Sequence, residues 1–432
     1  MEKKHKFDEK VEQQLARIVI DNEYAIAQTN QGQDIEDFQS YLDMFDAIRS
    51  EKDYDWMSDI FIPEFPSHML TQSSIDVAQY FQTRDFVEVY VMDKSDEAIA
   101  AADSTKELVN KSLNRRGLYH YQKYVRGKLL NHLTGSVWAE CWWEQDIKQN
   151  LMGYQVDEDT GLDDETKGVY DYEIRKDHFN YDILDPRNVF TDNTYKYSAQ
   201  DKDWIIIRSE TNLQKLQKES ERNGYFNLDL LKDVKTEGDS DTKTETTGKD
   251  NSQMEYLNKV GNPWDKLKRY GKHWVKNGKP GIDENGEILA DATLEEVVMT
   301  FIKKGNDKIL IGFNEQPYMD VNGNPYRPVI RGICYVHPTK DAGAGDGKYA
   351  RELQIGINDT FNLGNDRTRL ATIPTMKGKK YVTEDSDSIY FEPGHVMELE
   401  DPTTDLLEFR IEDNIQGALQ QMGVLTTKMQ QA

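Results

Sequence analysis

GAGDGKYARELQIGINDTFNLGNDRTRL, residues 343–370, begins as a glycine-rich loop and continues as a segment with helical periodicity. Three apolar residues recur there every four positions, at Leu353, Ile357 and Phe361. This spacing predicts one apolar face of an α-helix. Polar residues occupy other positions around the same helix, at Asn358, Asn362, Asn365 and Asp366.

Small residues form a second face of this predicted helix. Gly356, Thr360 and Gly364 follow one another at a spacing of four. Each glycine inside a helix costs about 1 kcal/mol relative to alanine. A row of small residues lets another backbone approach closely, so we interpret it as a packing surface for a second helix.

The same segment resembles the passage from wing to stem in portal proteins of tailed bacteriophages. A strand ending at Pro338 is followed by a glycine-rich turn and the pattern R-E-L-Q-x-x-I-N-D-x-x-N-x-x-x-D. The positions that match are Leu353, Gln354, Ile357, Asn358, Asn362 and Asp366. The resemblance extends from about Glu295 to the C-terminus, and more loosely back to about Asp53.

The composition suits an elongated or multi-lobed subunit. With 432 residues the chain can bury a large core in two or three substructures. Only 37% of the residues are hydrophobic and 30% are charged, so we expect further burial against neighbouring subunits. The formal net charge of −25 argues against a broad grip on nucleic acid, which needs clustered Lys and Arg. It is compatible with a surface past which a polyanion slides.

The cysteines and the apolar runs indicate a protein that folds in a cytoplasm. Cys141 and Cys334 lie in apolar strand-like runs, which predicts two reduced buried thiols and no disulfide framework. No run of 18 apolar residues occurs, and the N-terminus MEKKHKFDEK lacks the apolar core of a signal peptide. We therefore expect no membrane contact.

The first third of the chain is predicted to be mainly helical. Helical periodicity covers residues 8–50 with a polar break at 30–33, and further helices are expected over 67–81 and 95–133, the latter broken near Gly117. Residues 115–128 interleave basic and aromatic side chains, a pattern typical of single-strand nucleic-acid binders. In so acidic a chain we favour the alternative that these basic residues meet carboxylates of this subunit or of its neighbours.

The middle of the chain has the pattern of antiparallel β-structure. Strands are predicted over 136–144, 170–175, 180–184 and 204–208, and turn signals at 283–286, 305–307 and 321–324 predict an antiparallel meander between 272 and 336. Residues 231–254 are of low complexity and acidic, so we expect a mobile insertion on an outer surface. Taken with the helices, the pattern predicts an α+β fold.

The C-terminal part has the order helix, small β unit, helix. Pro374 ends the first helix, and short strands are expected over 379–383, 389–391 and 395–399. Helical periodicity returns over 411–431, with an apolar stripe at Ile415, Leu419, Met422 and Met429.

An alternative interpretation makes the glycine-rich loop a nucleotide site. Residues 342–348 nearly fit the phosphate-binding pattern [AG]-x-x-x-x-G-K between a strand and a helix. The next position should be Ser or Thr to bind magnesium, but it is Tyr349. The preceding strand also belongs to a hairpin meander and not to a βαβ unit. This interpretation predicts a P-loop-like motor or kinase.

Other catalytic or metal-binding patterns are missing from the sequence. No Ser/His/Asp or Cys/His arrangement stands out, and the eight histidines show no zinc-ligand spacing. We therefore predict no catalytic residue, no metal site, no cofactor and no enzymatic activity. Lys377, Lys379 and Lys380 form a small basic patch, which could meet an acidic partner or phosphates, or could equally protect an edge strand.

The resemblance implies a portal-like organisation. Residues 1–340 would form a wing of helices and antiparallel meander, 341–372 the first stem helix with its glycine-rich loop, 373–410 a β clip, and 411–432 the start of the second stem helix, with the crown beyond the chain. The channel and stem packing would involve Gly356, Thr360, Gly364, Asp366, Asn358 and Asn362. The clip would dock through Lys377, Lys379 and Lys380.

The function that follows by resemblance is that of a head-to-tail connector. The subunits would form a dodecameric ring at one capsid vertex, in contact with the major capsid protein. The ring would conduct double-stranded DNA without sequence specificity during packaging and ejection. It would dock the terminase large subunit and later the tail adaptor. Such a protein assembles in the host bacterial cytoplasm and remains in the virion. A capsid or adaptor protein without a central channel is a third interpretation, which particle symmetry would distinguish.

Overall fold

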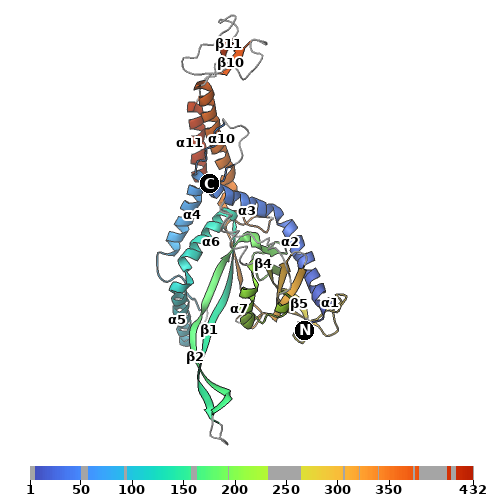
Figure 1. Cartoon of the computed structure of the whole chain (residues 1–432). Coiled ribbons are helices and arrows are strands. Elements are labelled where there is room, and N and C mark those ends of the chain that lie inside the picture. Colours follow the sequence, from blue (N-terminus) through green and yellow to red (C-terminus); the bar gives the residue numbers. More distant parts are fainter. Residues whose placement is uncertain are drawn as a thin grey trace. The chain divides into compact units, whose positions relative to one another are not determined.

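The chain divides into two compact units (Figure 1). The computed structural model describes residues 5–49, 57–91, 95–156, 163–192, 194–231, 264–304, 307–320, 322–338, 340–372, 375–378, 406–409 and 415–431. The first unit comprises residues 1–39 and 72–345, and the second comprises residues 40–71 and 346–432. The sequence predicts one continuous wing over 1–340, whereas residues 40–71 belong to the second unit.

The described elements make an α+β protein of helices and antiparallel sheets, as the sequence predicts. In the first half these are α1 (Glu9–Ala16), the π-helix η1 (Arg17–Tyr24), α2 (Ala25–Asn30), α3 (Gly32–Phe45), α4 (Glu64–Tyr80), α5 (Asp96–Leu113), the 3₁₀ turn η2 (Arg116–Leu118), α6 (His120–Thr134), β1 (Ser136–Val156) and β2 (Asp163–Leu184). The helix predicted over 95–133 is therefore broken near Gly117.

The remaining elements complete the sheets and the second unit. They are η3 (Pro186–Asn188), β3 (Val189–Thr191), β4 (Trp204–Thr211), α7 (Leu213–Asn223), α8 (Leu228–Leu231), β5 (Trp264–Lys276), β6 (Lys279–Pro280), β7 (Thr293–Lys304), β8 (Asp307–Glu315), β9 (Val329–Ile333), α10 (Asp346–Thr372), β10 (Thr375–Gly378), β11 (Leu406–Phe409) and α11 (Ile415–Gln431). Residues 232–263, which hold most of the predicted acidic insertion, lie outside the described part of the chain.

A six-stranded antiparallel sheet forms the centre of the first unit, with the order β3-β4-β5-β7-β8 and β6 paired to β5. Successive residues of β4 point to opposite faces. Ile206 packs with the helical residues Leu15 and Val19 on one face, while Ile205 and Ile207 pack with Trp138 on the other. Both faces of the sheet are thus covered here, which explains why the first half of β4, residues 204–207, is an unbroken apolar run.

The predicted meander is confirmed as β7 and β8, joined to the earlier strand β5. Two of its turns are closed by the same pattern of hydrogen bonds to an aspartate side chain. Asp283 Oδ1 accepts hydrogen bonds from the amides of Asn285 and Glu287, at 2.9 and 2.8 Å. Asp320 Oδ1 accepts from the amides two and four residues further on in the same way, both at 2.8 Å. Glycine follows Asn in each turn with a positive φ, 85° at Gly286 and 78° at Gly323.

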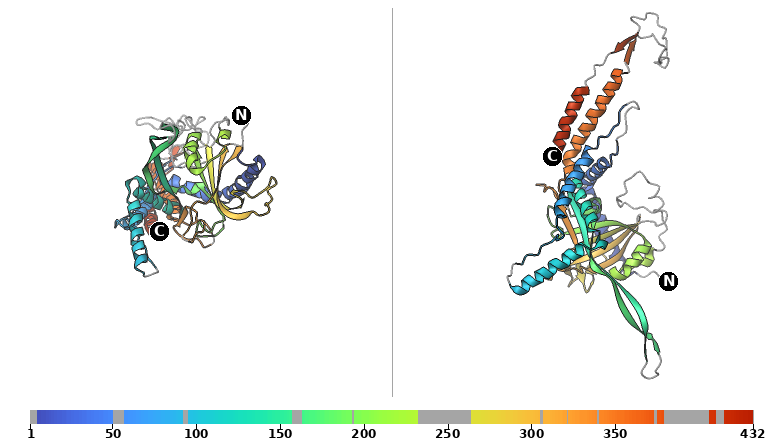
Figure 2. Two further views of the ribbon diagram at one scale, coloured as in Figure 1. Left: turned by 90° about the horizontal axis from the view of Figure 1, so that it is seen from below. Right: turned by 90° about the vertical axis from the view of Figure 1, so that its left-hand side faces the viewer.

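β1 and β2 form a long antiparallel ribbon that extends away from the six-stranded sheet (Figure 2). Its inner end is held by β9, which pairs with β1 from Ser136 to Glu140. The predicted strands at 136–144, 170–175 and 180–184 are therefore pieces of one ribbon. Cys141 and Cys334 are free but only half-buried, so the prediction of two fully buried thiols is wrong.

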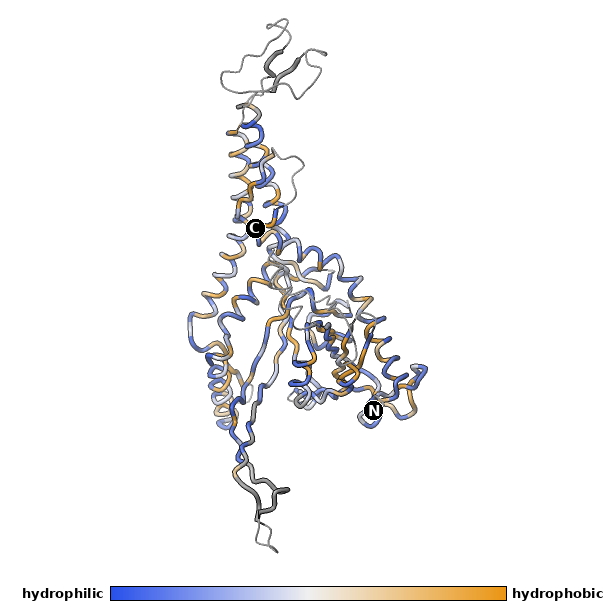
Figure 3. Tube along the Cα trace, viewed as in Figure 1, coloured by the Kyte–Doolittle hydropathy of each residue, from blue (hydrophilic) through white to orange (hydrophobic). Residues whose placement is uncertain are grey.

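The second unit contains the antiparallel helix pair α10 and α11, linked in sequence through the strand pair β10–β11. Figure 3 shows apolar residues interspersed with polar ones along both helices. The short strands predicted at 379–383, 389–391 and 395–399 lie outside the described residues. Within the described part of the chain, no helix combines the length and apolar character needed to cross a membrane.

Candidate functional site

The glycines of α10 lie against α11. A Cβ atom added at Gly356 would be 3.4 Å from Leu425 Cδ1, and one added at Gly364 would be 3.2 Å from Ala418 Cβ. The small residues therefore serve a close helix–helix approach, and the helix that approaches belongs to the same chain. A contact between neighbouring copies through this row stays a prediction.

A second face of α10 holds an extended segment of the same unit. Gln354, Asn358, Asn362 and Asp366 stand four residues apart, and their side-chain oxygens accept hydrogen bonds from the backbone amides of Phe65, Ile62, Ile60 and Ser58 respectively. We call these four side chains the polar ladder. Four residues advance a helix by about 6.0 Å, and two residues advance an extended strand by about 6.6 Å. The two repeats match over Ser58, Ile60 and Ile62, so a helix face can bind this extended backbone much as a sheet edge would. The fourth amide, that of Phe65, lies in the first turn of α4.

The polar ladder makes the most hydrogen bonds at its buried end. Gln354 is fully buried, and its amide nitrogen also donates to the carbonyl oxygen of Ile62 at 2.6 Å and to Asn358 Oδ1 at 2.8 Å. Asn362 donates to the carbonyl oxygen of Ile60 at 3.0 Å. The sequence assigns Asn358, Asn362 and Asp366 to the channel and the stem packing. In the structure their side chains bind the backbone of residues 58–62, and a contact with a channel stays a prediction.

The glycine-rich loop is packed against the turn between α6 and β1. Side chains at Gly343 or Gly345 would clash with backbone atoms of that turn, at Gly135 and its neighbours. The amide of Gly343 donates to Ser136 Oγ at 3.2 Å, and the amide of Ala344 donates to a carbonyl oxygen at 2.9 Å. These two amides therefore already donate hydrogen bonds within the chain, so this part of the loop does not offer them to a phosphate. The lysine of the motif, Lys348, is exposed.

The basic and aromatic residues of 115–128 separate into two groups. Most aromatic rings pack together, with Tyr80 stacked on Tyr124 at 4.1 Å between ring centroids. Lys128 pairs with Asp76 at 2.8 Å, and Lys123 donates to Asn180 Oδ1 at 3.0 Å. Both lysines have partners within the chain, and for Lys128 the partner is a carboxylate, as favoured from the sequence. Two arginines at the start of the segment, Arg115 and Arg116, are exposed.

The aromatic cluster contains a buried histidine. His120 Nδ1 lies 2.7 Å from the Tyr181 hydroxyl. Burial, followed by the nearby Lys123 charge, lowers the His120 pKa. Burial also raises the pKa of the Tyr181 hydroxyl. The imidazole is therefore neutral near pH 7, and it is part of the packing of α6 on β2.

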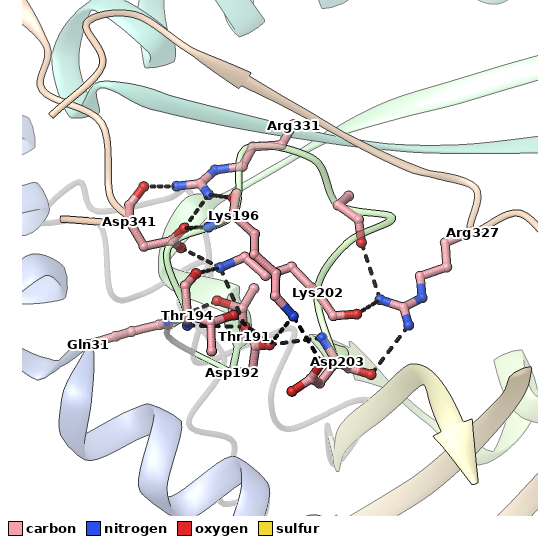
Figure 4. Close-up of polar contacts among 11 residues, drawn as sticks. Gln31, Thr191, Asp192, Thr194, Lys196, Lys202, Asp203, Arg327, Arg331 and Asp341 are labelled. Atoms are coloured by element: carbon pink, nitrogen blue, oxygen red, sulfur yellow. Dashed lines mark hydrogen bonds and ion pairs between the residues drawn. The ribbon is translucent and has the colours of Figure 1, made fainter. Parts of the chain in front are cut away.

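A buried ion-pair network, which the sequence analysis missed, ties the loop after β3 to the segment around β9 (Figure 4). Lys202 is fully buried, and its Nζ lies 2.8 Å from Asp341 Oδ2 and 3.4 Å from Asp192 Oδ1. Arg331 pairs with the other oxygen of Asp341 at 3.1 Å. Burial works to raise the Asp192 pKa, but the hydrogen bonds from the Asp203 amide and from Thr194, together with the Lys202 charge, lower it overall.

Arg327 forms the second half of this network. Its Nε lies 2.5 Å from Glu296, and its Nη1 donates to the carbonyl oxygens of Ala199 and Lys202 at 3.2 and 2.5 Å. The ion pairs of this network thus hold the loop after β3 in place, and each of its buried cations lies beside a carboxylate. Arg327 lies 125 and 128 residues from the two carbonyl groups to which it donates, so no local pattern could reveal these contacts.

The remaining predicted residues add little to a site. Lys377 lies in β10, whereas Lys379 and Lys380 are outside the described residues. Within the described ranges, no group of three or more His, Cys, Asp or Glu side chains could hold a metal ion. No family model matches the chain. The feature that stands out is therefore the helix pair of α10 and α11.

Proposed function

We propose that the chain is a portal subunit of a tailed bacteriophage, one of a ring of identical copies that encloses a channel for double-stranded DNA. The observation that carries the proposal is that α11 is almost uncharged and exposes apolar side chains. Lys428 is the one charged residue among the 17 of α11, although charged residues make up 30% of the whole chain. Three of its apolar side chains are exposed, Ile415, Leu419 and Val424, the last by 61%.

This surface has the character of an interface centre. Interface cores are depleted in charged residues, whereas a solvated helix normally carries them. The partner helix α10 adds the exposed Leu363, at 66%. Two helices that pack on each other bury one face of each helix. Apolar side chains outside that face are buried only when another partner covers them. Copies of the same helix pair, arranged around an axis, would supply it.

The order of elements in the second unit supports the same proposal. A long helix, a strand pair and a returning helix follow one another as α10, β10, β11 and α11. This is the order of stem, clip and stem in the family that residues 343–370 resemble. By that resemblance the clip docks the terminase large subunit, other surfaces contact the major capsid protein and the tail adaptor, and the subunit remains in the virion.

The acidic charge of the chain fits a conduit for DNA. A net charge of −25 per copy disfavours tight, lasting contacts with phosphates. We therefore expect the assembled ring to let duplex DNA pass and to retain little of it at physiological salt. The competing nucleotide-site interpretation gains no support, because the loop amides of Gly343 and Ala344 have partners within the chain.

Electron microscopy and mass photometry of the purified chain test the proposal. We expect closed rings for the wild type and their loss in Leu419→Glu/Val424→Glu, because buried charges in an interface core are costly. Gln214→Glu/Gln217→Glu on α7 is the matched control, since these exposed residues lie on another helix. A wild-type protein without annular particles, or rings unaffected by the α11 charges, would contradict the proposal.

A further inference from the structure

The turn between α5 and α6 exposes a basic and aromatic patch, which we call the tip. Its residues are Arg115, Arg116, Tyr119 and Tyr121. Tyr119 and Tyr121 are 63% and 54% exposed. Within the described chain neither arginine side chain has an ion-pair or hydrogen-bond partner. Large aromatic and arginine side chains of this kind are the commonest anchors of protein interfaces.

The backbone holds the tip in place. Tyr119 adopts a left-handed conformation with φ 54°, which turns the chain from η2 into α6. The Tyr121 ring packs against Phe81 with 5.1 Å between ring centroids. The tip is therefore presented by two helices and an aromatic cluster, so little ordering is needed when it binds.

A patch of opposite charge lies on the hairpin between β6 and β7, and we call it the acidic hairpin. Three exposed carboxylates, Glu284, Glu287 and Asp291, flank two exposed apolar side chains in the sequence, and the Asp291 carboxylate lies 4.0 Å from Lys276 Nζ. The two apolar side chains are Ile288 and Leu289, at 55% and 37% exposure. Carboxylates around an apolar centre match arginines around aromatic rings in both charge and polarity.

The two patches occupy opposite sides of the first unit. The acidic hairpin lies beside α1, because Lys10 Nζ contacts Glu284 at 2.5 Å. Both Figure 1 and the left panel of Figure 2 place α1 and α5 at opposite sides of this unit. Complementary patches on opposite sides of one body cannot pair within that body. They suit a head-to-tail contact between copies, the kind that closes into a ring.

We propose that the tip of one copy docks on the acidic hairpin of the next copy. This inference rests on the proposed function, and it adds a specific pair of contact surfaces that are distinct from α11. Arg115 and Arg116 face Glu284, Glu287 and Asp291, while Tyr119 and Tyr121 cover Ile288 and Leu289. A second copy is favoured over nucleic acid, because the chain carries −25 charges and already presents the matching acidic surface.

Charge reversal with rescue tests this contact in the full chain by mass photometry. Arg115→Glu/Arg116→Glu and Glu284→Lys/Glu287→Lys should each raise the concentration for half-assembly by about tenfold or more. Combining both pairs should bring assembly back toward the wild type, because the two patches regain opposite charges. Higher salt should weaken the wild-type contact. Lys215→Glu/Lys218→Glu, exposed on α7, is the matched control and should assemble normally.

The outcomes separate this inference from the proposed function. Rings that persist unchanged in Arg115→Glu/Arg116→Glu would overturn the tip contact and leave the portal proposal standing. Open, tip-dependent oligomers without closed rings would support the contact and contradict the portal proposal. A wild type that stays monomeric would overturn both. Loss of oligonucleotide binding in the tip variant, with assembly intact, would assign the tip to nucleic acid instead.

Discussion

Asn362 binds both polar groups of the Ile60 backbone, accepting from its amide at 2.9 Å and donating to its carbonyl oxygen at 3.0 Å. A single helix side chain thereby replaces the two hydrogen bonds that a neighbouring strand would provide. Gln354 does the same for the amide of Phe65 and the carbonyl oxygen of Ile62. The extended segment 58–62 and the start of α4 are thus held by α10 without any sheet.

Removing the buried end of the polar ladder should be more damaging than removing its exposed end. Gln354→Leu leaves the Phe65 amide without a partner, which costs about 1–3 kcal/mol of unfolding free energy. The Ile62 carbonyl oxygen loses the Gln354 amide but still accepts from the Glu64 amide. Asn362→Leu should cost less, because water can reach the Ile60 backbone. Urea denaturation, with hydrogen exchange at Ser58, Ile60 and Ile62, measures both effects.

Asp359→Ala is the control for this series, because Asp359 is an exposed residue of the same helix. It should leave exchange in residues 58–65 unchanged. Equal protection of these amides in Gln354→Leu and in the wild type would show that the ladder does not hold the segment.

How much of this could be predicted from the sequence depended on how far apart the interacting residues lie. The Asn-Gly turns and β4 were predicted because their signals are local, as Asp283 and Gly286 illustrate. The polar residues of α10 were visible too, but their function was not. Their partners lie 289 to 308 residues away along the chain, and a periodic pattern on one helix does not say what covers it.

Sequence distance limited the prediction of ion pairs in the same way. The sequence predicts carboxylate partners for the lysines of 115–128, and for Lys128 this is confirmed by Asp76. It gave no sign that Lys202 would be fully buried between Asp192 and Asp341. A buried lysine depends on a network assembled from distant loops, and composition alone cannot show which of many charges will be enclosed.

Three of the glycines in the helix pair, Gly423, Gly356 and Gly364, should respond differently to alanine. Gly423 has open space around it, so Gly423→Ala should stabilise the protein by about 1 kcal/mol through helix propensity alone. Gly356→Ala should gain a similar amount, since its Cβ would make an ordinary contact with Leu425. Gly364→Ala should gain little or lose stability, because the Ala418 Cβ at 3.2 Å must move away. Thermal and urea unfolding rank the three variants.

Leucine at the same positions extends the comparison. Gly356→Leu and Gly364→Leu should both destabilise the α10–α11 pair, because neither site has room for a branched side chain. If Gly364→Leu proved as stable as the wild type, the two helices would not pack through this face.

Lys202 should be among the most sensitive charged residues of the first unit. Lys202→Met leaves Asp192 and Asp341 buried without their shared cation, which costs about 3–5 kcal/mol. Adding Asp341→Asn to this variant should cost less than the same change in the wild type, because Asp341 has then already lost Lys202 and keeps only Arg331. Lys196→Met, which breaks a more exposed contact with Asp203, should change stability far less. Additive effects of Lys202→Met and Asp341→Asn would mean that the pair is not coupled.

His273 should make the protein less stable in mild acid. Burial, followed by the nearby Arg269 charge, lowers its pKa from 6.5 to about 4. Its Nε2 is buried without a hydrogen-bond partner among the described residues, and the ring lies 6.4 Å from the Phe313 ring. The imidazole therefore stays neutral in the folded protein, while the unfolded chain binds a proton below about pH 6.5.

Because the unfolded state binds more protons between pH 6.5 and 4, stability must fall as the pH is lowered through that range. The contribution of His273 between pH 7 and 5 should be about 2 kcal/mol. His273→Gln does not titrate there, so its unfolding free energy should fall less over the same interval than that of the wild type. Urea denaturation at the two pH values measures this difference, and equal pH dependence in both proteins would show that His273 does not titrate between them on unfolding.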